Sequence, residues 1–270
     1  MKFSLLMSIY SKENPEYFDR AMISIWDEQS IKPYEIILVQ DGKLTPQLYK
    51  VIEKWEQKCQ GVLVCVVLEE NLGLGDALNI GLQKCSFERV ARMDTDDIAH
   101  PQRFQRQLEV FEQLDIDVCG SWVSEFDTDE KNIVSYRKLP EFHQDITAFA
   151  KLRNPINHPT SMYNKTPVLE AGNYQRMLWF EDYYLWARMI QNGAKFYNIQ
   201  DTLINMRAGY GQLQRRGGIN YAIQEYKFEK QLLNINFITS IEFIRNIFIR
   251  FIARVIPQNL RKNIYKILRK

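Results

Sequence analysis

The chain has 270 residues, of which 46% are hydrophobic and 25% charged, a composition that excludes an intrinsically disordered protein. Its net charge is +2, but residues 241–270 hold eight basic residues and one acidic residue, so residues 1–240 carry a net charge of −5. An acidic body argues against a nucleic-acid-binding protein, which needs basic residues beside exposed aromatic ones. The four cysteines include no CxxC pair, which argues against a zinc site or a disulfide framework.

The N-terminal sequence MKFSLLMSIYSKENP has one lysine and a short apolar run, and it lacks a small-residue cleavage site. These features predict a first strand rather than a signal peptide. No stretch of the sequence approaches the roughly 20 consecutive apolar residues of a membrane span. We therefore expect a protein that stays in the cytoplasm.

The first half of the chain alternates between short apolar runs and segments of helical periodicity. We predict strands at 3–10, 35–39, 62–68, 89–93 and 118–126, and helices at 15–29, 46–59, 76–85 and 101–114. Strand–helix alternation with short connections predicts an α/β fold, in which helices cover both faces of a mostly parallel sheet.

The second half is less regular. We predict a helix at 179–191 and a strand near 195–199, and the Gly- and Arg-rich segment 207–218 is typical of a mobile loop. The tail predicts two amphipathic helices separated by Pro257. In the first of these, a narrow polar stripe interrupts an otherwise apolar surface and consists of Glu242, Asn246, Arg250 and Arg254.

Polar residues follow three of the predicted strands, at Ser8 to Ser11, at Asp41-Gly42 and at Asp94 to Asp97. Ligands of such a sheet bind beyond the carboxyl ends of its strands, so we expect these three groups to converge. Asp94-Thr95-Asp96 places two carboxylates in alternate positions, which is typical of a site where Mg²⁺ or Mn²⁺ is shared with substrate phosphates. A solvated acidic turn is the alternative interpretation.

Six segments of the chain, in this order, resemble the family 2 glycosyltransferases, which have the GT-A fold. They are LLMSIYSKEN at 5–14, EIILVQDG at 35–42, NLGLGDALNIGL at 71–82, ARMDTDD at 91–97, NHPTSMY at 157–163 and EDYYLWARMIQNG at 181–193. The resemblance is strongest to bacterial transferases that build O-antigen or capsular repeat units. It implies a metal-dependent, inverting transfer of a sugar from a nucleoside diphosphate, with uridine as the expected base, to an acceptor hydroxyl.

The resemblance also divides the chain and assigns residues. It implies a GT-A catalytic domain at 1–218, with a nucleotide-sugar half at about 1–126 and an acceptor half at about 127–218, followed by a helical segment at 219–270. The residues implied to bind the nucleotide sugar are Ser8, Tyr10, Glu13, Asp41, Asn71, Gly73, Asn79, Arg92, Asp94, His158, Arg207, Arg215 and Arg216. A divalent cation, Mn²⁺ or Mg²⁺, is implied at Asp96 with Asp94 beside it. The usual D-G-S of the family is Asp41-Gly42-Lys43 here, which leaves the aspartate in place.

Glu181-Asp182 opens a predicted helix, where the helix dipole alone would favour acidic residues. The resemblance implies that Asp182 is the general base that accepts the proton of the acceptor hydroxyl, with Glu181 as the second candidate. His158, next to a proline, is interpreted either as a structural residue or as a sugar-binding one. The arginines of 207–218 either lie on a solvated loop without a function or compensate the negative charge of the diphosphate.

The basic, apolar tail favours association with an anionic membrane surface over packing on the catalytic domain or a dimer interface. With the resemblance, it predicts a lipid-linked glycan acceptor and a location on the cytoplasmic face of the cell membrane. Two other functions would use a similar sheet and similar carboxylates. A sugar nucleotidyltransferase would show a Gly-rich basic loop after the first strand, which MSIYSKENP lacks. A non-catalytic nucleotide-sugar-binding protein would not need both Asp96 and Asp182.

Overall fold

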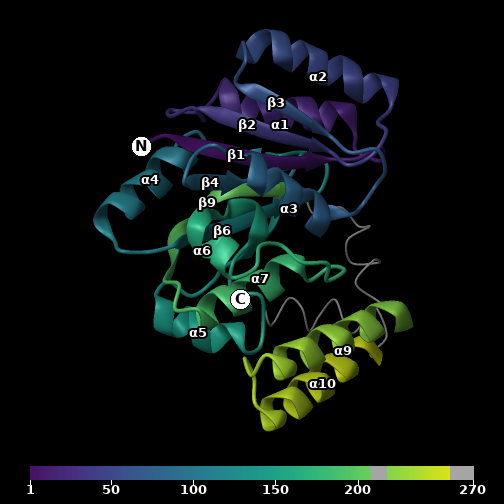
Figure 1. Cartoon of the computed structure of the whole chain (residues 1–270), viewed down its shortest axis with the longest axis vertical. Coiled ribbons are helices and arrows are strands. Elements are labelled where there is room, and N and C mark those ends of the chain that lie inside the picture. The colour runs from purple at the N-terminus through teal and green to yellow at the C-terminus, as the bar shows by residue number, and fades with distance from the viewer. Residues whose placement is uncertain (208–217, 256–270) are drawn as a thin grey trace.

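A computed structural model describes residues 1–207 and 218–255, with side chains through Arg250. Within these residues, one nine-stranded sheet has the strand order β3-β2-β1-β4-β8-β6-β9-β5, and β7 pairs with β6 (Figure 1). The strands are β1 (Phe3–Ile9), β2 (Glu35–Gln40), β3 (Leu63–Val67), β4 (Arg89–Arg92), β5 (Ile98–Ala99), β6 (Val118–Phe126), β7 (Ile133–Arg137), β8 (Met162–Asn164) and β9 (Phe196–Arg207). The helices are α1 (Pro15–Trp26), α2 (Pro46–Cys59), α3 (Leu74–Lys84), α4 (Arg103–Gln113), α5 (His143–Ala150), the 3-10 turn η1 (His158–Thr160), α6 (Lys165–Glu170), α7 (Glu181–Gln191), α9 (Ile219–Asn234) and α10 (Ser240–Val255).

The sheet is parallel where the first half of the chain builds it. β1 pairs in parallel with both β2 and β4, and β2 with β3, as the alternating pattern predicts. The second half departs from this pattern, because the short strand β8 lies between β4 and β6 and is antiparallel to both. β6 then pairs in parallel with β9, whose twelve residues extend the strand expected near 195–199. The sheet is therefore mixed rather than mostly parallel.

Local sequence signals begin the first two helices. The side chain of Asn14 accepts hydrogen bonds from the backbone N–H groups of Glu16 and Tyr17 at 2.8 and 3.4 Å, and Pro15 follows it. Thr45 caps α2 in the same way before Pro46. Capping side chains satisfy N–H groups that have no partner within the helix, and proline lacks that donor altogether.

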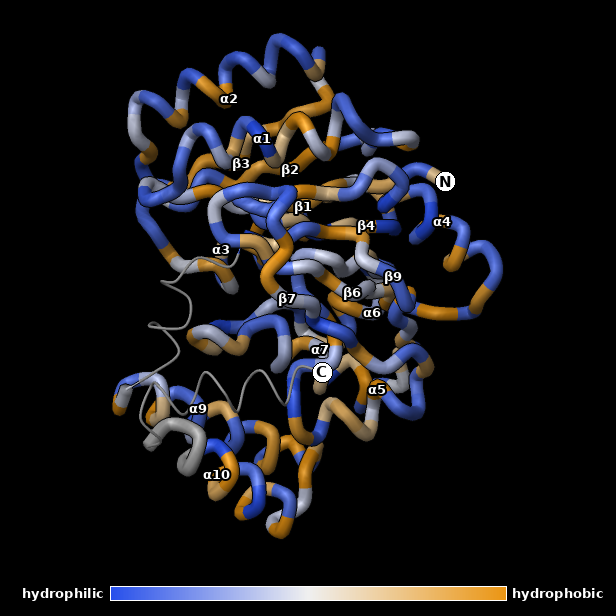
Figure 2. The backbone as a smooth tube through the Cα atoms, turned by 180° about the vertical axis from the view of Figure 1, so that it is seen from behind, coloured by the Kyte–Doolittle hydropathy of each residue, from blue (hydrophilic) through white to orange (hydrophobic). Residues whose placement is uncertain are grey.

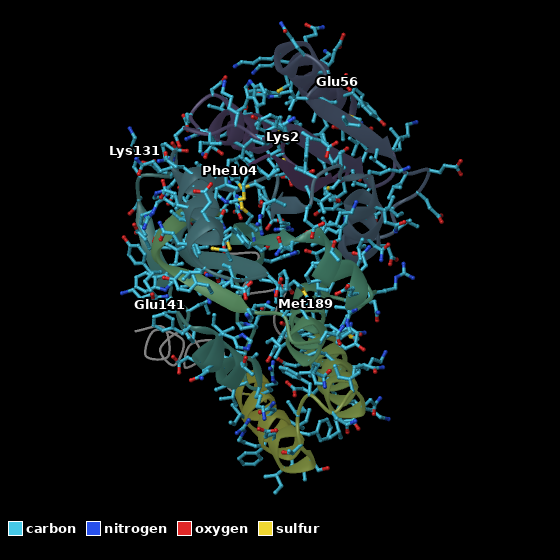
Figure 3. All side chains as sticks on the ribbon, turned by 60° about the vertical axis from the view of Figure 1, so that its left-hand side comes forward. Lys2, Glu56, Phe104, Lys131, Glu141 and Met189 are labelled. Atoms are coloured by element: carbon cyan, nitrogen blue, oxygen red, sulfur yellow. The ribbon has the colours of Figure 1, made fainter. Side chains whose placement is uncertain are left out.

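Alternate residues of the central strands are buried on opposite faces of the sheet. Leu5 and Met7 of β1 pack in one cluster with α1, α2 and α4, whereas Leu6 packs in the other with α3 and α7. Phe104 of α4 and Met189 of α7 belong to these two clusters respectively, and side chains fill both sides of the sheet (Figure 3). Burial on both faces explains why these strands read as continuous apolar runs.

The helices after the sheet pack on the rest of the protein. A third cluster joins α7 to α9 through aromatic side chains, among them Phe180, Tyr183 and Phe228. α9 and α10 lie side by side at the end of the molecule opposite α1 and α2 (Figure 1). Among the described helices, none is both long and apolar enough to cross a bilayer. The second predicted tail helix, beyond Pro257, lies outside the described residues.

Candidate active site

The three polar groups predicted to converge do follow neighbouring parallel strands. β2, β1 and β4 are adjacent in the sheet, so Asp41, Tyr10 and Asp94 come at the same edge. A direct contact joins two of these strand ends, because the hydroxyl of Thr95 donates a hydrogen bond to Glu13 Oε2 at 2.7 Å. Ser8 is half-buried at the end of β1, and Tyr10 after it is exposed at this edge.

Asp41 is buried, and its carboxylate holds the segment that leads into α3. Oδ1 accepts the backbone N–H of Leu72 at 2.7 Å, and Oδ2 accepts the N–H of Gly73 and the amide of Asn71, both at 3.0 Å. Gly42 has φ +81, and a Cβ there would lie 2.8 Å from the backbone nitrogen of Asn71. Asp41, Gly42 and Asn71 therefore position the turn at the edge of the sheet where β1, β2 and β4 end.

The side chain of Asn79, which the resemblance implies to bind the nucleotide sugar, is hydrogen-bonded within the protein. Its amide donates to the backbone oxygen of Tyr174 at 2.6 Å, and its Oδ1 accepts from Gln83 at 2.8 Å. The same segment is tied back by Asn173, whose amide donates to the backbone oxygen of Asn79 at 3.1 Å. The side chain of Asn79 thus fastens α3 to the segment before α7.

Like charges gather in the turn after β4. Burial raises the pKa of Asp96 to about 7, with further contributions from Asp94 and Glu13. Asp97 is fully buried; burial and then Asp96 raise its pKa, although its Oδ1 accepts the backbone N–H of Arg207 at 2.9 Å. The turn concentrates negative charge that the described side chains only partly neutralise.

Arg92 is the cation at the centre of this site. It is 1% exposed and forms an ion pair with Asp94 through Nη2. Burial alone would lower its pKa, but Asp94 raises it, so the guanidinium stays charged. Nε and Nη1 have no hydrogen-bond partner among the described residues. Burial raises the pKa of the carboxyls of Glu181 and Asp182, and the charge of Arg92 partly opposes that rise. Arg92 therefore acts on both the Asp94–Asp97 turn and the start of α7.

Arg207 braces the acidic turn. Its guanidinium lies 3.7 Å from the ring centroid of Tyr17 and 4.6 Å from that of Phe126, and Nε donates to the backbone oxygen of Asp96 at 3.3 Å. This packing on two rings explains how a basic side chain at the end of β9 is held beside the turn. Arg215 and Arg216 lie outside the described residues.

Glu181 and Asp182 form the first turn of α7. Asp182 is buried, and its Oδ2 accepts a hydrogen bond from the amide of Asn154 at 2.6 Å. Burial raises the pKa of Asp182, and the Asn154 hydrogen bond opposes that rise. Burial, and then Asp182, raise the pKa of Glu181 to about 7. α3 approaches α7 closely here, since a Cβ at Gly75 would lie 3.3 Å from Glu181 Cβ.

His158 in η1 belongs to an aromatic cluster behind the acidic groups. Its Nε2 is 3.0 Å from the Tyr174 hydroxyl, and its ring packs against Tyr174 and Trp186. Burial and the charge of Arg92 hold its pKa well below the usual range, so the imidazole is neutral. These contacts support the structural interpretation of His158.

Three residues of this region had no signal in the sequence. Asn154 meets Asp182 across 28 residues of chain, and Tyr174 contacts His158 and Asn79 from a segment without regular structure. Trp179, two residues before Glu181, has φ +70, a left-handed conformation that is uncommon for a bulky side chain. Long-range contacts place all three, so periodicity and spacing do not reveal them.

The carboxylates of the described residues fit a divalent cation that takes its remaining ligands from substrate and water. No group of three His, Cys, Asp or Glu side chains within 1–207 and 218–255 forms a complete metal site. Mg²⁺, however, is commonly held by one or two carboxylates, with the remaining ligands from substrate phosphates and water. Asp94 and Asp96 match that donor set, and the accumulated negative charge of the turn would be relieved by a cation.

Comparison with known proteins decides the family. Residues 4–172 match the family model described as glycosyl transferase family 2. The chain belongs to this family. A galactosyltransferase of Escherichia coli, named UDP-Gal:alpha-D-GlcNAc-diphosphoundecaprenol beta-1,3-galactosyltransferase, is 37% identical over 98% of this chain and 95% of its own length. The amylovoran biosynthesis glycosyltransferase AmsE of Erwinia amylovora is 38% identical over 98% of each chain.

Solved glycosyltransferase structures share the fold. TarS of S. aureus, in complex with UDP-GlcNAc, superposes with a TM-score of 0.66 at 18% identity, over 87% of this chain and 67% of the other. The mannosyltransferase PcManGT of Pyrobaculum calidifontis, in complex with GDP-Man and Mn²⁺, gives a TM-score of 0.65 at 12% identity, over 86% and 64%. The predicted GT-A fold and family 2 membership are confirmed, and this glycosyltransferase is favoured over a nucleotidyltransferase or a non-catalytic binding protein.

Proposed function

We propose that this family 2 glycosyltransferase transfers a sugar from a UDP-sugar to a hydroxyl of a lipid-linked glycan during the synthesis of a surface polysaccharide such as O-antigen or capsule. The activity named for the E. coli relative, whose similarity spans nearly the whole chain, supports this donor and acceptor class. The observation that carries the proposal is the placement of Arg92, whose charge acts on the Asp94–Asp97 turn and on Glu181-Asp182 at once. One buried cation between two acidic groups fits a site where donor and acceptor meet.

The donor half of the site would bind the nucleotide sugar at the carboxyl ends of β1, β2 and β4. Ser8, Tyr10 and Glu13 lie there, and Asp41 holds the Asn71–Gly73 turn beside them. Asp96, with Asp94, would hold Mn²⁺ or Mg²⁺, which neutralises charge on the leaving diphosphate. Arg92 forms an ion pair with Asp94, and Arg207 supports the turn through the backbone of Asp96.

Transfer would proceed by a single displacement. The acceptor oxygen forms a bond to the anomeric carbon as the bond from that carbon to the diphosphate oxygen breaks, and the diphosphate leaves with the electron pair. Asp182 accepts the hydroxyl proton, and Asn154 orients its carboxylate. Attack from the face opposite the leaving group inverts the anomeric configuration. Glu181 is the alternative base, since a pKa of about 7 also suits proton transfer near neutral pH.

The acceptor half would be formed by residues of about 127–218, and the enzyme would work at the cytoplasmic face of the membrane as a peripheral protein. The basic residues of 241–270 support that location, because each basic residue near an anionic surface contributes roughly 1 kcal/mol. Residues 219–270 would form a helical segment outside the catalytic domain proper, although α9 packs on α7.

Calorimetry of UDP binding with and without Mn²⁺ tests the donor assignment. Mn²⁺ should strengthen UDP binding to the wild-type protein, and Asp96→Ala should remove that effect. Asp115→Ala is the matched control, because Asp115 is exposed and pairs only with Lys195 at the surface. A metal effect that persists in Asp96→Ala would remove Asp96 from the metal site, and an absence of UDP binding in the wild type would contradict the proposed donor.

A further inference from the structure

Three residues of the polar stripe of α10, namely Glu242, Asn246 and Arg250, face the protein. Asn246 is 2% exposed, and its amide donates to the backbone oxygen of Lys151 at 2.8 Å and to Glu229 Oε2 at 3.0 Å. One turn later, Arg250 pairs with Glu225 at 2.7 Å and with Glu229 at 2.8 Å, both on α9. Asn246 and Arg250 are thus bonded within the protein, whereas Arg245 of the same helix is exposed.

Several apolar residues of α10 face outward, whereas Phe243 packs against the cluster that joins α7 to α9. Ile241, Ile244 and Phe248, spaced three and four residues apart, are 81%, 67% and 65% exposed. A helix on the surface of a globular protein normally has the reverse orientation, with its apolar stripe in the core. Figure 2 shows hydrophobic positions recurring along α10 at the end of the molecule away from the sheet. Exposed apolar surface of this kind marks an interaction site.

The adjacent helix extends this surface. Ile223 and Tyr226 of α9 are exposed on one side of that helix, and the Tyr226 ring lies 5.9 Å from the ring of Phe243 on α10. We define the α9–α10 face as Ile223, Tyr226, Ile241, Ile244 and Phe248. It is built from two packed helices, so it presents a broad apolar surface rather than a single isolated side chain.

The charges around the α9–α10 face are of one sign. The three acidic residues of 218–250 are Glu225, Glu229 and Glu242, and each is bonded toward the protein, the last with Lys151 and Thr239. Within residues 218–250, the exposed charged residues of the two helices are Lys227, Lys230 and Arg245. The sequence that follows, 256–270, contains five basic residues and no acidic one. The surroundings of the face are therefore complementary to an anionic surface.

We propose that the α9–α10 face docks on an anionic lipid bilayer, with Ile241, Ile244 and Phe248 inserted at the interface. Apolar side chains buried at the headgroup boundary supply binding energy, and basic residues around them add attraction to anionic lipids. A second copy of the chain fits less well, because a two-fold contact through this face would bring like-charged rims together without acidic partners. This inference rests on the proposed lipid-linked acceptor for its purpose, but it is tested without it.

The face also leads to the acceptor end of the site. Tyr221, in the first turn of α9, stacks on Trp179 with ring centroids 5.1 Å apart and planes 17° apart. Trp179 is itself partly exposed, and Glu181 follows two residues later. Docking through α9 and α10 would thus bring the membrane next to the segment that carries the candidate base. A glycan whose lipid anchor remains in the bilayer could reach that segment without being extracted.

Co-sedimentation with vesicles tests the docking surface. The variant carries Ile244→Ser and Phe248→Ser, and the matched control carries Val134→Ser and Tyr136→Ser, two exposed apolar residues of β7 far along the chain from the face. Wild-type protein and control should bind vesicles of phosphatidylglycerol and phosphatidylethanolamine, and less well those of phosphatidylcholine. The variant should bind the anionic vesicles at least about tenfold more weakly, because tenfold corresponds to the loss of only about two buried CH₂ groups. Raised salt should weaken wild-type binding without abolishing it.

Three outcomes would overturn the docking proposal. Equal vesicle binding by wild type and variant would place the membrane contact elsewhere in the chain. A wild-type dimer in light scattering that the variant loses, without vesicle binding, would assign the face to a second copy. A wild type that does not bind vesicles, with a variant of lowered thermal stability, would mean that residues 256–270 cover the face. UDP calorimetry on the same preparations is independent, so failure of docking and failure of the proposed activity are distinguishable.

Discussion

The acidic turn after β4 and the contact between α9 and α10 both bury carboxylates, but they do so in opposite ways. At α9 and α10, Glu225 and Glu229 both pair with Arg250, and this cation opposes the rise that burial causes in the pKa of Glu229. At the turn, burial and mutual repulsion raise the pKa of both Asp96 and Asp97. Buried charge that is paired stabilises a packing arrangement, whereas buried charge that is left unneutralised indicates a site that awaits a ligand. The comparison distinguishes a structural cluster from a functional one.

The largest expected effect comes from removing the unneutralised charge at the turn. Asp96→Ala should lower transfer by roughly three decades or more, because metal stabilisation of a leaving group is worth several kcal/mol. The free energy of unfolding should stay unchanged or rise, since a buried carboxylate with a raised pKa is lost. Radiolabelled sugar transfer and thermal denaturation on the same sample measure the two quantities. A variant that loses activity only because it unfolds would refute the functional interpretation of the turn.

Asp182→Asn should leave UDP affinity nearly unchanged and lower turnover by roughly two to four decades, the usual contribution of a positioned base. The substituted amide retains the shape of the side chain beside Asn154. Glu181→Gln is the paired variant, and the base is the residue whose replacement removes the acidic limb of the pH–rate profile. Near-normal turnover in Asp182→Asn would transfer the role to Glu181.

Substitution in the ion-pair cluster of α9 and α10 should change the free energy of unfolding rather than substrate binding. Arg250→Met leaves Glu225 and Glu229 without their cation, so it should lower the free energy of unfolding by about 3 kcal/mol while UDP affinity is retained. Lys195→Met is the control, because its pair with Asp115 is exposed and should contribute at most about 1 kcal/mol. Equal effects of the two substitutions in chemical denaturation would contradict the structural importance of the α9–α10 cluster.

The smallest effect concerns the pH dependence of stability at Glu181. Its pKa is about 7 in the folded chain and near 4.5 in the unfolded one, so the folded state holds the proton more tightly and stability falls as pH rises between these values. Glutamine cannot ionise, so Glu181→Gln should add on the order of 2 kcal/mol at pH 8 and little at pH 4. Urea denaturation at the two pH values measures this, and a gain of equal size at both would contradict the burial-driven shift.

Much of the donor half could be predicted from local sequence. Asn14-Pro15 and Thr45-Pro46 begin helices where they were expected, and the apolar runs of β1, β2 and β4 end at the polar groups that meet at one edge. The family assignment followed from six motifs, four of them in this half, and was confirmed. These features depend on residues within one turn or one strand of each other, so periodicity and spacing are sufficient to reveal them.

The partners of those residues could not be predicted in the same way. Asp41 accepts hydrogen bonds from the backbone of Leu72 and Gly73, and Asn79 donates one to the backbone of Tyr174. Both contacts join segments distant in the chain, so local sequence does not predict them. The antiparallel strand β8 enters the sheet between β4 and β6 for the same reason, since nothing in three residues specifies a neighbour.

The sequence by itself determined which residues of α10 are polar and which are apolar, and it predicted a helix with a narrow polar stripe. Only the tertiary structure decided which side faces the protein. The stripe turns inward because Glu225 and Glu229 on α9 offer Arg250 and Asn246 better partners than water would, across 17 to 25 residues of chain. An amphipathic pattern specifies that a helix has two faces, but the long-range pairing of charges determines where each face points.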